Sequence, residues 1–75
     1  MEDVVLGPKT RCEADRLLAQ IRRADTMIAA VKAGARAEGF VLGLETAGAL
    51  RAGDAENLYL VFESAIEKRL KILVP

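Results

Sequence analysis

The chain has 75 residues, of which 52% are hydrophobic and 29% charged, and its 11 basic residues balance its 11 acidic ones. This composition argues against intrinsic disorder, although a chain this short buries little more than about 60% of the surface that its unfolded form exposes. One cysteine, Cys12, and no histidine exclude an internal disulfide and the common zinc sites, so we expect oligomerisation to supplement the core.

The stretches without a charged residue are too short to span a bilayer, which takes about 18 apolar residues. The longest of them are 26–31, 39–44 and 57–62. The acidic start Met1-Glu2-Asp3 also lacks the basic residues and apolar run of a secretory signal. We therefore expect a soluble, cytoplasmic protein that does not cross a membrane.

The amino-terminal segment predicts a short extended arm over residues 1–8, because its apolar stretch ends at a Gly-Pro pair and proline keeps its predecessor out of the helical region. Thr10 and Glu13 follow with the spacing of a capping box, in which both side chains satisfy free backbone amides at the start of a helix. We expect the first helix to begin there and to span residues 10–48.

The first half of this predicted helix carries an apolar stripe with alternating steps of four and three residues. Such a stripe is typical of a coiled-coil-like seam between two helices. Because the core is small, we expect a second copy of the chain to cover it. The predicted self-association residues are Leu17, Ile21, Ala24, Ile28 and Val31.

The apolar face changes side in the second half of the predicted helix, from residue 37 onward. Either the helix bends near Gly34 or Gly39, or one long helix faces two different neighbours. We favour the long helix, because a row of small residues would let another helix backbone approach closely. The row comprises Ala35, Gly39, Gly43 and Ala47.

Gly48 suits the left-handed backbone conformation that closes a helix, and Asp54 suits the N-cap of a second helix over residues 54–73. The apolar face of this second helix is wide and is interrupted by Arg69. The predicted fold is all-α: a single domain, residues 1–75, forming an antiparallel helical hairpin with a long first helix, completed as a homodimer.

The sequence offers no catalytic constellation. Without histidine, neither Ser64 nor Cys12 can form the usual pair of nucleophile and base. Cys12 would lie in the first turn of a helix, where the pKa of a thiol can fall, but an inert thiol is the simpler interpretation. We expect no enzymatic activity, no cofactor and no metal.

The charges are unevenly distributed, with seven basic and three acidic residues between 9 and 36 and one basic and six acidic between 37 and 67. Basic side chains in this density can cover the flanks of a seam, bind an acidic protein or contact phosphates. Tyr59 and Leu60 lie toward the outer side of the second helix, where they could form a docking patch. The candidate partner-binding residues are Arg11, Arg16, Arg22, Arg23, Tyr59 and Leu60.

The stretch from Glu38 to Leu50, followed by Asn57 to Glu63, resembles in texture and size the small helical accessory proteins of phages and mobile elements in GC-rich proteobacteria. The resemblance covers less than half of the chain and carries over no functional residue. It implies a tiny helical protein of a class in which many members bind and inhibit a host defence or regulatory protein.

Three functions are open at this point. The first is a non-enzymatic, dimeric protein that binds a host protein and blocks it by steric occlusion. The second is a small dimeric regulator that binds nucleic acid, which the zero net charge and the absence of a clear helix-turn-helix spacing disfavour. The third is a structural assembly module without a ligand.

Overall fold

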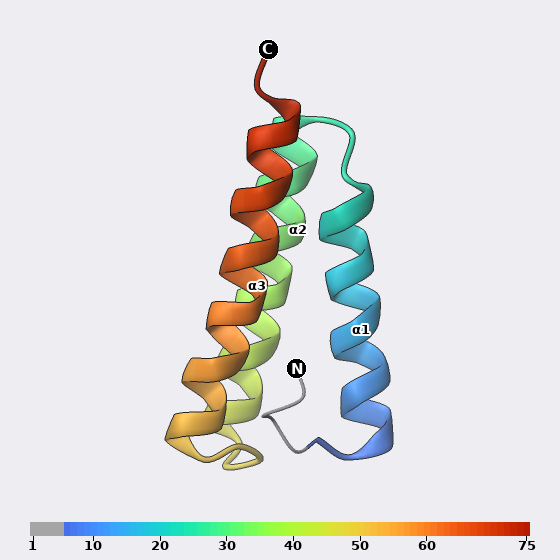
Figure 1. Cartoon of the computed structure of the whole chain (residues 1–75). Coiled ribbons are helices and arrows are strands. Elements are labelled where there is room, and N and C mark those ends of the chain that lie inside the picture. Colours follow the sequence, from blue (N-terminus) through green and yellow to red (C-terminus); the bar gives the residue numbers. More distant parts are fainter. Residues whose placement is uncertain (1–5) are drawn as a thin grey trace.

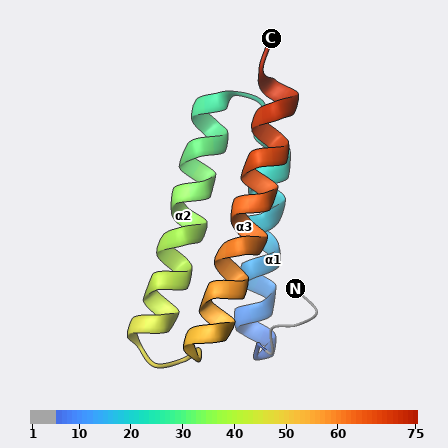
Figure 2. The same ribbon diagram turned by 60° about the vertical axis from the view of Figure 1, so that its left-hand side comes forward.

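The computed structural model describes residues 6–75, and within them the chain forms three helices and no strand. The helices are α1 (Pro8–Arg23), α2 (Met27–Thr46) and α3 (Ala52–Leu73). They run up, down and up as a bundle in which α2 is antiparallel to both of its neighbours, whereas α1 and α3 pack side by side in parallel (Figures 1 and 2). The molecule measures 40 × 21 × 20 Å. The all-α prediction is confirmed.

The prediction of one continuous helix over residues 10–48 is wrong, because the chain leaves the helical conformation between α1 and α2. Ala24 has φ −58° and ψ 127°, and Thr26 has φ −132° and ψ 158°. The Thr26 hydroxyl accepts a hydrogen bond from the backbone N–H of Ala29 at 3.0 Å, so it is the N-cap of α2. The apolar stripe assigned to one helix therefore runs across two.

The chain reversal also explains why the apolar face changes side along the sequence. The fold-back between α1 and α2 resets the helical phase, so that the inward face of α2 no longer continues the stripe of α1. α2 itself continues through both Gly34 and Gly39, so the interruption of the predicted long helix lies at residues 24–26, before either glycine.

The predicted row of small residues does not meet another helix of the chain. Its members are exposed, and a Cβ atom at Gly39 or Gly43 would have no neighbour within 4 Å. Close approach instead occurs at Gly34, where a Cβ would lie 2.5 Å from Cδ1 of Ile66 on α3. The glycine that permits close packing of α2 and α3 is therefore the one outside the row.

The helix ends differ from their predicted positions by two residues at both starts. α1 begins at Pro8 because proline suits the first helical position, and α3 begins at Ala52 with Arg51 as its N-cap. Asp54 lies in the first turn and accepts a hydrogen bond from Nε of Arg51 at 3.1 Å. Gly48 has φ +72°, as predicted for the residue that closes a helix. Of the predicted arm, residues 1–5 lie outside the described residues.

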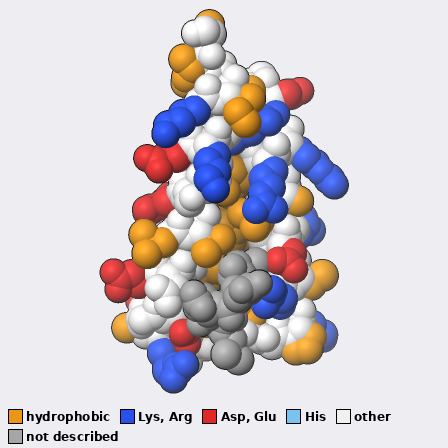
Figure 3. Space-filling model, viewed as in Figure 1, with side chains coloured by type: hydrophobic (Ala, Val, Ile, Leu, Met, Phe, Trp, Pro, Cys, Tyr) orange, Lys and Arg blue, Asp and Glu red, His pale blue; other side chains and the backbone are white. Residues whose placement is uncertain are grey.

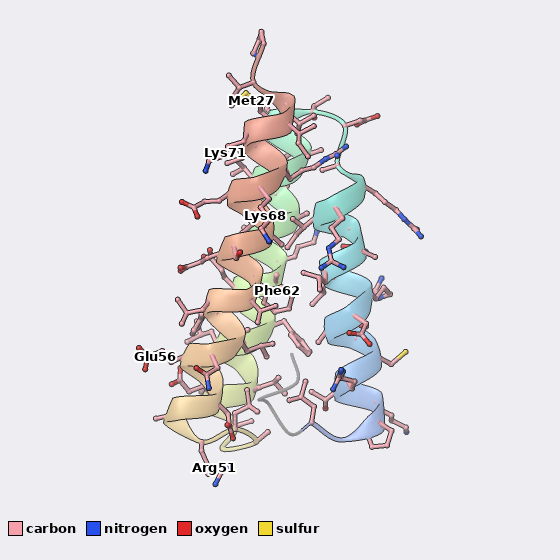
Figure 4. The ribbon with its side chains drawn as sticks, in the orientation of Figure 1. Met27, Arg51, Glu56, Phe62, Lys68 and Lys71 are labelled. Atoms are coloured by element: carbon pink, nitrogen blue, oxygen red, sulfur yellow. The ribbon has the colours of Figure 1, made fainter. Side chains whose placement is uncertain are left out.

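The core combines side chains from all three helices. Phe62 is fully buried near its centre and projects from α3 toward α1 in Figure 4. α2 and α3 together thus cover the seam residues of α1 that were predicted to face a second copy. No helix of the described part of the chain is long and apolar enough to cross a membrane. The core residues are Ala14, Leu17, Leu18, Ile21, Ala33, Ala37, Val41, Ala55, Leu58, Phe62 and Ala65.

Candidate partner-binding groove

A groove of about 570 Å³ runs between α3 and the carboxyl-terminal end of α1, and we call it the α1–α3 groove. Apolar side chains line its floor, three cations surround them, and no carboxylate of the described residues lines it. Figure 3 shows Lys and Arg side chains gathered over the upper half of this face, with hydrophobic side chains between them. The lining residues are Arg22, Leu60, Val61, Ser64, Ala65, Lys68, Arg69 and Ile72.

The α3 side of the groove carries apolar side chains that α1 and α2 leave partly uncovered. Val61, Ala65 and Ile72 lie on the flank of α3 next to α1 and, together with Lys68, follow steps of four, three and four residues. This is the spacing of a helix seam. Leu60 and Ile72 remain 57% and 69% exposed, so the two ends of the groove are apolar and uncovered.

Arg69 holds one wall of the groove in place. Its Nε atom donates a partly buried hydrogen bond to the backbone carbonyl of Ala24, the C-cap of α1, at 2.6 Å. A cation at this position also complements the negative end of the α1 dipole. The residue that interrupts the apolar face of α3 therefore joins the end of α1 to α3, 45 residues further along the chain.

The other two cations of the groove are not engaged in this way. Neither Arg22 nor Lys68 forms an ion pair with a carboxylate of residues 6–75. Both are exposed, and Figure 4 shows Lys68 on the side of α3 that borders α1. Their charges remain available to a ligand of opposite sign.

The structure brings together two of the predicted partner-binding residues, Arg22 from α1 and Leu60 from α3. Arg23 is exposed and does not line the groove, and Tyr59 is half-buried against the core. These two predicted residues therefore do not extend the groove surface.

The remaining predicted arginines are paired along α1. Nε of Arg11 lies 3.8 Å from Oδ1 of Asp15, and Nε of Arg16 donates to Oε2 of Glu13 at 3.0 Å. The hydrogen bond from Arg16 holds the pKa of the Glu13 carboxyl below its ordinary value. Both pairs are exposed, so they contribute little to stability, but they offset positive charge that a partner would otherwise meet.

Three further residues line the groove that the sequence did not predict as partner-binding: Lys68, Arg69 and Ile72. The steps of four and three on α3 could have identified Lys68 and Ile72 as seam positions. Nothing in the sequence placed them opposite Arg22, because that juxtaposition depends on the reversal of the chain after α1.

The predicted self-association residues do not form one surface. Leu17, Ile21 and Ala24 are buried inside the single chain, whereas Ile28 and Val31 are 71% and 57% exposed on α2. The predicted seam therefore divides into core positions and surface positions. The exposed pair lies with Leu42 and the small residues on what we call the outer face of α2. This face comprises Ile28, Val31, Ala35, Gly39, Leu42 and Gly43.

The groove offers a ligand apolar contacts and positive charge. Ser64 is its one hydroxyl group, and the side chains around it are apolar or cationic. Cys12 is exposed on α1 and does not line the groove. Within residues 6–75, no three His, Cys, Asp or Glu side chains lie close enough together to hold a metal ion. The arrangement is suited to binding a complementary surface.

Comparison of the chain with family models, with curated proteins and with solved structures found no match.

Proposed function

We propose that this protein is a non-enzymatic protein-binding module that acts by covering a segment of its partner. One observation carries the proposal: the α1–α3 groove combines exposed apolar side chains with three cations, and none of the described residues lining it is acidic. The buried core of a protein interface is apolar, and arginine is enriched among the residues that contribute most to binding. Leu60 and Ile72 supply apolar surface here, and Arg22 supplies the arginine.

The size of the molecule is compatible with such an interface. A standard stable interface buries about 800 Å² per partner, which is roughly a sixth of the 5047 Å² accessible surface of this chain. A partner segment held in the groove is withheld from its other contacts. Steric occlusion is therefore the proposed mode of action, and a phage-type inhibitor of a host defence or regulatory protein is its most specific form.

The test is affinity purification from a lysate of the natural host, with and without nuclease, using two matched variants. Leu60→Asp places a charge in the groove, and Val74→Asp places the same charge at an apolar side chain that lines neither the groove nor the outer face of α2; the two residues are 57% and 55% exposed. We expect the wild type and Val74→Asp to recover one stoichiometric, nuclease-resistant protein that Leu60→Asp does not recover. Equal recovery by both variants would exclude the groove as the binding surface.

A small regulator that binds nucleic acid is the alternative, and the cluster of Arg22, Lys68 and Arg69 favours it. Phosphate groups would satisfy these cations and would give binding that weakens steeply with salt. The apolar floor of the groove favours protein, because a phosphate backbone has no apolar side chains to cover Leu60 and Ile72. Nuclease-sensitive recovery of many proteins would move the proposal to nucleic acid.

Self-association is a further part of the proposal, and it concerns a different surface. Because α2 and α3 pack against α1, a second copy is not needed to cover its seam residues. We propose that the homodimer forms through the outer face of α2, where Ile28, Val31 and Leu42 are exposed. Small residues between them would permit close contact of two helices.

A further inference from the structure

This inference rests on the proposed protein-binding function: we infer that the segment bound in the α1–α3 groove is an acidic amphipathic α-helix, which completes a four-helix bundle. The proposal names the chemistry of the occupant, and its support comes from the shape of the groove, its charge and the ligands that it disfavours.

The shape of the groove fits a helix. Its α3 wall runs from Leu60 to Ile72, which corresponds to about 18 Å or roughly three helical turns. Val61, Ala65, Lys68 and Ile72 along this wall follow the steps of four and three residues at which a helix receives the side chains of a packed neighbour. Ser64 and Ala65 make the middle of the wall low, between larger side chains at both ends, so a helix can approach closely there.

The charge of the groove specifies the flanks of that helix. Arg22 reaches the groove from α1 and Lys68 from α3, so a helix lying between α1 and α3 has a cation on each side of its apolar stripe. No carboxylate among residues 6–75 pairs with either cation. Charge complementarity of this kind sets the specificity and the association rate of an interface. Carboxylates on both flanks of the occupant satisfy both cations.

Two other occupants fit the groove less well. Nucleic acid would meet the cations but would leave the apolar floor uncovered. A second copy docked groove against groove would place the cations of one copy against those of the other, which opposes association. A second copy docked by another surface would form a head-to-tail contact, which builds a ring or an open filament in place of the proposed dimer.

The test uses synthetic amphipathic peptides of about 18 residues, a length that supports a helix. The acidic peptide has leucines along one stripe and glutamates on both flanks; the matched basic peptide has lysines in place of the glutamates. Fluorescence anisotropy measures their binding to the intact protein. We expect the acidic peptide to bind at least about tenfold more tightly than the basic one, and its binding to weaken as salt screens the charges.

Charge reversal at Lys68 and at a matched surface lysine locates the binding. Lys68→Glu is expected to weaken binding of the acidic peptide at least about tenfold, whereas Lys32→Glu on α2 leaves it within about twofold. Circular dichroism verifies that both variants fold. Equal binding of the two peptides, equal effects of the two variants, or no binding of the acidic peptide at about 1 mM would each overturn the inference.

The two proposals fail in different ways. If Leu60→Asp abolishes recovery of the host protein but the acidic peptide does not bind, the groove binds protein and the occupant is not an acidic helix. If the acidic peptide binds through Lys68 but the host protein is recovered equally with Leu60→Asp, the chemistry of the groove holds and its assignment to that partner is wrong.

Discussion

At the break between α1 and α2, the hydroxyl group of Thr26 satisfies a backbone amide that a continuous helix would have satisfied with a carbonyl. Thr26→Ala is therefore expected to lower the free energy of unfolding by about 1 kcal/mol. Thr10, the residue that the sequence suggested as a cap, lies inside α1, so Thr10→Ala is expected to change stability by less than about 0.5 kcal/mol. Urea denaturation measures both, and an equal loss in the two variants would contradict the assignment of the cap.

Arg69 is the residue that joins the end of α1 to α3, through its 2.6 Å hydrogen bond to the carbonyl of Ala24. Arg69→Met keeps the apolar part of the side chain but leaves this carbonyl without its charged donor. The expected cost is about 1.5–3 kcal/mol, the range for a hydrogen bond to a charged group. Lys68→Met is the control, because it also removes a positive charge from α3 but from an exposed side chain. A similar loss of stability in this variant would show that the loss in Arg69→Met comes from the missing charge and not from the missing hydrogen bond.

At the scale of the helix, α2 has two kinds of glycine. A Cβ at Gly39 would meet nothing within 4 Å, whereas a Cβ at Gly34 would lie 2.5 Å from the side chain of Ile66. Gly39→Ala is expected to raise the free energy of unfolding by about 0.5–1 kcal/mol, because alanine loses less backbone entropy in a helix. Gly34→Val is expected to lower it by about 1–3 kcal/mol through overpacking. Denaturation curves that shift in the same direction would contradict this difference between the two faces.

The helices themselves were largely predictable, because local chemistry specifies them. The periodicity of α3, the left-handed Gly48 and the end of α2 follow from side chains and backbone preferences within a few residues. The break at Thr26 was missed because the apolar steps of four and three continue across it. The spacing of apolar residues indicates which side of a helix is apolar, but it does not indicate whether the next turn belongs to the same helix.

At the scale of the whole molecule, two exposed surfaces make separable contributions. Ile28 on the outer face of α2 and Ile72 in the groove are 71% and 69% exposed, so aspartate at either position leaves the core intact. We expect Ile28→Asp to convert a dimer to a folded monomer and Ile72→Asp to remain dimeric while losing the partner. Light scattering gives the mass of each; a wild-type protein that is already monomeric would exclude self-association through α2.

The candidate site was predictable only in part. The sequence predicted Arg22 and Leu60 as partner-binding residues, because one is basic and the other is an apolar residue toward the outer side of its helix. Both line the groove. Arg11 and Arg16 have the same composition-based support, but they pair with Asp15 and Glu13 on their own helix. Whether a basic residue is available to a partner depends on its neighbours in space, and those were visible only once the helices had been placed.

The sequence by itself determined the class of the fold, the amphipathic character of its helices and the lack of a histidine-based catalytic or zinc site, because residue types and short-range spacing decide these properties. Tertiary structure decided which apolar residues form the core and which remain on the surface. Leu17 and Ile28 belong to one stripe in the sequence, yet the first is buried in the three-helix core and the second is exposed. The reason is that burial depends on what packs against a face: the chain reverses at Thr26 and again after α2, and these two reversals bring α2 and α3 against α1.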